Sequence, residues 1–107
     1  MSKEELIKIL EKTKSEHLLE AAKIKDVIGD PIYFWLMRHY YAYEFVLQFI
    51  KGKTEIQKEL EELAIKLDRD LIKIYKSTEL DNRPIALINS YEDKLNALEQ
   101  TIKLLTS

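Results

Sequence analysis

Residues 31–51 have the sequence PIYFWLMRHYYAYEFVLQFIK, which holds the only tryptophan, all three phenylalanines and four of the six tyrosines of the chain. The stretch suits a helix of about six turns, and Pro31 stands where a helix begins most easily. Apolar side chains cover far more of its circumference than burial in a small bundle requires. The segment therefore predicts a helix that must be covered on more than one side.

Turn signals bracket this helix. Gly29 suits the position after a preceding helix, Asp30 the N-cap of the new one, and Gly52 the residue after its last turn. On the rest of the chain apolar positions recur at steps of three and four, as expected of amphipathic helices. These positions are Leu6, Leu10, Thr13, His17, Ala21, Ile24 and Ile28, then Ile56, Leu60, Leu63, Leu67, Leu71 and Ile74, and finally Ile88, Tyr91, Leu95, Leu98, Ile102 and Leu105.

The sequence predicts one all-α domain over residues 1–107. Capping boxes of Ser2 with Glu5 and of Thr54 with Gln57 begin the first and third helices. Because the turns are short, neighbouring helices should run antiparallel, as in an up-down-up-down four-helix bundle. In the alternative arrangement, the first two helices fuse into a kinked rod that pairs with a second chain. The expected helices cover about residues 2–28, 31–51, 54–78 and 83–106.

Composition excludes several classes of protein. The chain is 46% hydrophobic and 34% charged, with a net charge of −2, and has no basic stripe to support nonspecific nucleic-acid binding. With no cysteine, disulfides, thiolate catalysis and zinc fingers are excluded. Residues 31–51 have the length of a membrane span, but Arg38 and Glu44 inside them argue against one. We expect a cytoplasmic protein, and the abundance of Lys, Glu, Ile and Leu is typical of thermophiles.

A helical wheel at about 100° per residue divides residues 31–51 into two faces. We expect Ile32, Trp35, His39, Val46, Phe49 and Ile50 to point inward. The opposite arc begins with aromatic residues and methionine, which are enriched at protein interfaces. This arc predicts a partner interface, most simply for self-association, unless the helix is a central one covered by three neighbours. The predicted interface residues are Tyr33, Met37, Tyr40 and Tyr41.

Both histidines fall on predicted inward faces. If the first two helices pair around Gly29, then His17, Glu20 and His39 lie at similar heights, with Tyr43 nearby. Two imidazoles and a carboxylate inside a bundle could hold a metal, or form a structural hydrogen-bond network, which the single carboxylate favours.

Other charged residues have simpler interpretations. Arg38 is expected to stack on a ring or to pair with a carboxylate of the first or third helix. Glu92 and Asp93 are expected to be solvated flanks of the last helix.

No motif of a known helical-bundle enzyme is complete. A ferritin-like di-metal centre needs Glu three residues before His, but Lys14 and Leu36 occupy those positions. The Cys-x-x-Cys-His of a covalently held haem is absent, as are Gly-rich phosphate loops. The sequence therefore predicts no catalytic residues and no cofactor, and favours association over catalysis.

Residues 17–53, which end in AYEFVLQFIKGK, resemble the first helical hairpin of HEPN-type domains in hydrophobic pattern and in the pair Ala42 and Glu44. These domains are small prokaryotic helical bundles, often dimeric and often associated with RNA cleavage or nucleotidyltransferase partners. Ribonucleolytic members carry an arginine and a histidine separated by several residues, whereas here His39 follows Arg38 directly. The resemblance thus implies a dimeric bundle, and as a third possible function an RNA- or nucleotide-associated protein without nuclease activity.

Overall fold

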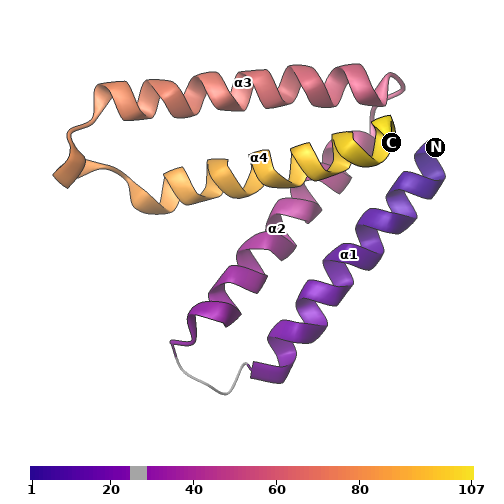
Figure 1. The fold of residues 1–107 in the computed structure, drawn as a ribbon, viewed down its shortest axis with the longest axis horizontal. Coiled ribbons are helices and arrows are strands. Elements are labelled where there is room, and N and C mark those ends of the chain that lie inside the picture. The colour runs from indigo at the N-terminus through magenta and orange to yellow at the C-terminus, as the bar shows by residue number, and fades with distance from the viewer. Residues whose placement is uncertain (25–28) are drawn as a thin grey trace.

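A computed structural model describes residues 1–24 and 29–107, which form four α-helices and no strand. The helices are α1 (Lys3–Ile24), α2 (Pro31–Lys51), α3 (Ile56–Ser77) and α4 (Ile85–Thr106), with a short 3-10 turn, η1 (Leu80–Asn82), before α4 (Figure 1). The prediction of an all-helical chain with four helices is confirmed. The predicted end of the first helix, with Ile28, lies outside the described residues.

Local chemistry explains most helix ends. The Glu5 amide donates to Ser2 Oγ at 3.1 Å, and the Ile32 amide donates to Asp30 Oδ1 at 2.8 Å. Gly29 has a φ of 78°, a left-handed conformation that glycine adopts without a steric cost. These contacts form the predicted starts of α1 and α2.

The predicted capping box of Thr54 and Gln57 does not form. The N-cap position of α3 is Glu55 and not Thr54, and no side chain caps this helix, which begins at Ile56. Gln57 Nε2 donates to Glu61 Oε1 of the same helix at 3.2 Å. Helix α4 begins at Ile85 and also has no side-chain cap.

The helices form two hairpins. Helix α1 packs along α2, and α3 packs along α4, while the hairpins meet mainly through α2 and α4. Lys3 Nζ donates to the carbonyl oxygens of Lys51 and Lys53, both at 2.9 Å, so the start of α1 lies beside the end of α2. Figure 1 shows the α3–α4 hairpin crossing the other one, with the end of α1 and the start of α2 pointing away from it.

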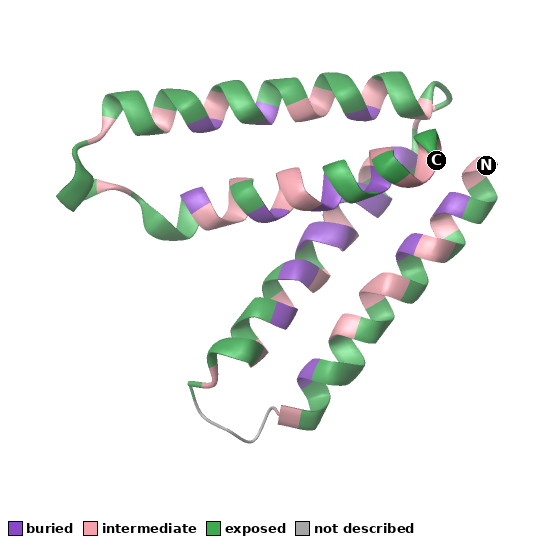
Figure 2. Ribbon diagram, viewed as in Figure 1, coloured by how far each residue is buried: buried purple, intermediate pink, exposed green. Residues whose placement is uncertain are grey.

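The core lies where the hairpins cross. Figure 2 shows the buried residues gathered there, while the outer parts of both hairpins are mostly half-buried or exposed. The core draws on all four helices, with fully or nearly fully buried Leu6, Leu10, Val46, Leu47, Ile50, Leu60, Ala97 and Leu98. The helices are therefore well packed at the crossing, and their parts away from it are less covered.

The chain is more open than a compact monomer of its length. Its radius of gyration is 15.2 Å, whereas about 13 Å is usual for a compact domain of this length. Its accessible surface is 7190 Å², whereas a compact monomer of its mass would expose about 6,200 Å². The crossed hairpins therefore expose surface that a closed bundle would bury.

Candidate functional site

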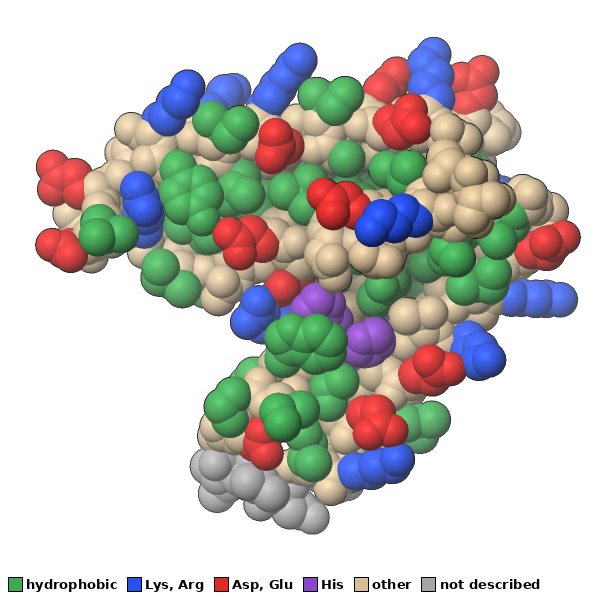
Figure 3. All heavy atoms as spheres, in the orientation of Figure 1, with side chains coloured by type: hydrophobic (Ala, Val, Ile, Leu, Met, Phe, Trp, Pro, Cys, Tyr) green, Lys and Arg blue, Asp and Glu red, His purple; other side chains and the backbone are tan. Residues whose placement is uncertain are grey.

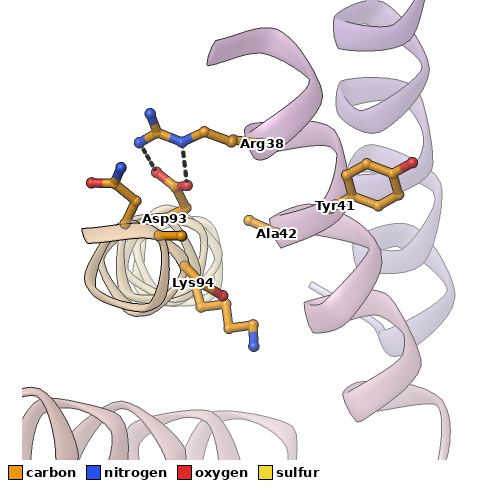
Figure 4. Close-up of a pocket in the computed structure, with 8 residues that line it drawn as sticks. Arg38, Tyr41, Ala42, Asp93 and Lys94 are labelled. Carbon is orange, nitrogen blue, oxygen red and sulfur yellow. Dashed lines mark hydrogen bonds and ion pairs between the residues drawn. The ribbon is translucent and has the colours of Figure 1, made fainter. Parts of the chain in front are cut away.

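An ion pair joins α2 to α4 at the crossing. Arg38 Nε donates to Asp93 Oδ2 at 2.8 Å, and Arg38 Nη2 donates to Asp93 Oδ1 at 2.9 Å. The guanidinium therefore binds both carboxylate oxygens (Figure 4). The Asp93 side chain is 9% exposed and that of Arg38 43%. The hydrogen bond to Asp93 raises the pKa of Arg38. This two-pronged geometry fixes both the position and the direction of the contact.

His39 lies directly beside this ion pair. Its Nε2 is 3.8 Å from Asp93 Oδ1, and its buried ring has its centroid 4.0 Å from that of Trp35. Burial lowers the pKa of His39, the charge of Asp93 opposes this shift, and the neighbouring His17 and Arg38 side chains add to it. The structure therefore favours a neutral imidazole next to a carboxylate that Arg38 already neutralises.

His17 of α1 completes what we call the ring cluster, which consists of Trp35, His39, His17 and Tyr43. Its ring stacks on that of His39 with centroids 6.0 Å apart and lies 5.6 Å from that of Tyr43. His17 Nδ1 donates to the Thr13 carbonyl oxygen at 2.8 Å. The structure thus brings together three of the four residues of the predicted histidine site.

Glu20, the fourth residue of that predicted site, lies apart from the ring cluster. It is exposed and pairs with Lys23 at 2.9 Å. Within residues 1–24 and 29–107 no group of three or more His, Cys, Asp or Glu side chains is placed to hold a metal ion. Metal binding at His17 and His39 stays a prediction.

Sequence reasoning missed Asp93. It was expected to be a solvated flank, and Arg38 was expected to pair with the first or third helix, but Asp93 of α4 is buried and is the partner of Arg38. A signal was available in the small residues of α4 on the same face as Asp93, at helical spacing. Those residues, Ala86, Ser90, Ala97 and Thr101, favour a close approach of another helix.

The predicted interface arc of α2 lies partly against α1. Tyr33, Met37 and Tyr40 are half-buried, and of the four predicted residues only Tyr41 is exposed, at 63%. Lys14 of α1 donates to Glu44 Oε2 at 2.6 Å and places its ammonium 5.7 Å from the Tyr40 ring centroid. Helix α1 therefore covers part of the arc that was predicted to be a partner interface.

The first two turns of α2 are more exposed than predicted on the side that was expected to point inward. Ile32 and Trp35 were expected to point inward, but they are 62% and 48% exposed. They lie towards the tip of the α1–α2 hairpin, beyond the crossing with α4, where Figure 3 shows the purple histidines beside green hydrophobic side chains. We call Ile32 and Trp35, with the half-buried His17 and Ile24 of α1, the open inner face.

The buried imidazole predicts an acid sensitivity. Because the pKa of His39 is lower in the folded protein than in the unfolded chain, the unfolded chain binds more protons below about pH 6.5. The stability that depends on neutral His39 is complete above that pH and falls as the pH drops through the lowered pKa. Urea denaturation at about pH 7.5 and about pH 5.5 should show this loss, and His39→Gln should reduce it. An equal loss in His39→Gln would contradict the assignment.

Comparison with protein-family models, with curated proteins and with solved structures found no match to this chain. In the part of the chain that the structure describes, no helix has the length and hydropathy needed to cross a membrane.

Proposed function

We propose that the protein is a self-association module in which the open inner face binds the same face of a second copy. The supporting observation is that Ile32 and Trp35, which continue the inward side of α2, are 62% and 48% exposed. Large apolar side chains that extend a buried seam into solvent are typical of an interface. The proposal keeps the predicted role of the first half of α2. It moves the interface from the arc of Tyr33, Met37, Tyr40 and Tyr41 to the face that carries Ile32 and Trp35.

The surface area supports a partner of standard size. The accessible surface of 7190 Å² exceeds that of a compact monomer by about 950 Å². Each subunit of a standard protein–protein complex buries about 800 Å². One interface on the open inner face would therefore reduce the accessible surface area of the chain to about that of a compact folded monomer.

A second copy is the simplest partner for this face. Glu20 and Lys23 are exposed on α1 and pair with each other, so this part of α1 brings no unpaired like charges together when a two-fold axis relates two copies. Two α1–α2 tips packed face to face would give four helices in a bundle. The antiparallel four-helix bundle predicted for one chain would then be completed between two chains.

The resemblance to HEPN-type hairpins agrees with this proposal, because it implies dimerisation. It stays a prediction, as does an association with RNA or nucleotides. Arg38, the arginine nearest to a histidine in the sequence, is already paired with Asp93.

Sedimentation velocity of the untagged chain tests the proposal. We expect the mass to rise from 12.7 kDa towards twice that value between about 1 µM and about 500 µM, a range that covers weak and strong dimers. A chain that sediments as a monomer at every concentration would rule out self-association.

A further inference from the structure

We propose that a cleft between α2 and α4 binds a small organic anion with a flat apolar body, of which an aromatic carboxylate is the simplest kind. The cleft has a volume of about 310 Å³, within the range of small-ligand sites. It shares no residue with the open inner face, so the inference does not rest on self-association. Arg38, Tyr41 and Ala42 line it from α2, and Ala86, Ser90 and Lys94 line it from α4.

Small side chains leave the space for the ligand. Ala42 of α2 faces α4 (Figure 4). From α4, the short side chains of Ala86 and Ser90 line the cleft. Tyr41 also lines the cleft, but its ring lies on the side of α2 away from α4 (Figure 4). The methyl groups of Ala42 and Ala86 suit a flat apolar body better than a fully polar one.

The charges of the lining favour an anion. The carboxylate of Asp93 is neutralised by Arg38, which grips both of its oxygens. The ammonium of Lys94 has no carboxylate within 4.0 Å among the described residues, and lies 4.7 Å from the Phe45 ring centroid. The lining therefore carries one unmatched positive charge, which a single negative charge on the ligand would balance.

Two neutral polar groups can orient the ligand. Asn89 and Ser90 are half-buried on α4, and neither side chain makes a hydrogen bond to another described group. Of the buried polar side-chain atoms that the structure describes, only Arg83 Nε has no partner, so Asn89 and Ser90 are reached by solvent. Their amide and hydroxyl groups are therefore available to bind the oxygens of a carboxylate.

NMR titration of the ¹⁵N-labelled chain with 2-naphthoate tests the proposal. We expect saturable shifts centred on the amides of Ala42, Ala86, Ser90 and Lys94. The neutral analogue 2-naphthylmethanol should bind at least about fivefold more weakly, and Lys94→Gln should weaken 2-naphthoate binding by about the same factor, since each removes one charge-assisted contact. Ala86→Leu, which adds bulk at an exposed helical position, should weaken binding about tenfold by filling the cleft.

The control is Lys73→Gln, which removes an exposed lysine of α3 that does not line the cleft. It should bind 2-naphthoate as the unmodified chain does, and circular dichroism should show every variant folded. Equal affinity for the neutral analogue, shifts centred on Ile32 and Trp35, or no saturation at about 10 mM, where even a millimolar site is mostly filled, would each overturn the proposal.

Discussion

Replacing Ile32 with glutamate should convert the protein to a monomer over the concentration range in which the unmodified chain dimerises. Ile32 is 62% exposed in the single chain, and in the proposed dimer it would be buried at the centre of the open inner face. A buried carboxylate without a partner is costly, and central interface residues dominate affinity. We expect the dimer dissociation constant to rise about a hundredfold or more, as for a hot spot, measured by sedimentation equilibrium.

The position of Ile32 means that Ile32→Glu should not weaken helix α2. Ile32 lies in the first turn of α2, next to Pro31 and after the cap Asp30. An acidic residue there interacts favourably with the helix dipole, by about 0.3–1 kcal/mol. Loss of the dimer in Ile32→Glu could therefore not be attributed to a weakened helix, and thermal melting should show the variant folded.

Phe34→Glu is the matched control. Phe34 is 54% exposed in the same turn, but on a wheel it shares a face with Tyr41 and not with Ile32. We expect Phe34→Glu to dimerise normally. A dimer broken by Phe34→Glu and unaffected by Ile32→Glu would contradict the open inner face as the interface, and would place the contact on the side of Tyr41.

Replacing Arg38 with alanine should destabilise the fold by about 2–3 kcal/mol. The change leaves the carboxylate of Asp93, whose side chain is 9% exposed, without its positive partner. Breaking a fully buried pair in this way costs about 3–5 kcal/mol. We expect less because the Arg38 side chain is 43% exposed, so its removal lets water reach the carboxylate. Urea denaturation at neutral pH measures the change.

The variant Asp93→Asn distinguishes the contribution of the ion pair to stability from the contribution of side-chain packing. In that background Arg38→Ala should cost much less, because a neutral amide needs no counter-charge. The two single variants and the double variant form a cycle that gives the coupling between the side chains. Arg69→Ala, an exposed position on α3, is a control that should change stability by less than about 0.5 kcal/mol. Additive effects of the two single changes would show that the pair contributes nothing specific.

The sequence predicted those elements whose signals are local. Gly29, Asp30 and Gly52 marked both ends of α2, because turn and cap chemistry acts within a few residues. The capping box of Thr54 and Gln57 was wrong because Glu55 and not Thr54 is the N-cap residue of α3. Sequence patterns locate a helix start only to within one or two residues.

The candidate site was harder to predict, because it depends on how the hairpins meet. Periodicity correctly placed His39 and Val46 on one buried face of α2. It also placed Trp35 there, since it cannot show where along a helix a neighbour stops covering it. The crossing decides where this cover ends, and Arg38 and Asp93, which pair across it, are 55 positions apart. No local pattern links such distant residues.

The two-hairpin arrangement also bears on how the chain acquires its structure. Contacts within each hairpin join helices that are neighbours in sequence, α1 with α2 and α3 with α4. The loops to be closed are short, so each hairpin can form early and quickly. Docking of α4 on α2 is then the step that brings distant parts of the chain together, and we expect it to come late. On this view Arg38 and Asp93 serve as the point at which two prefolded halves recognise each other.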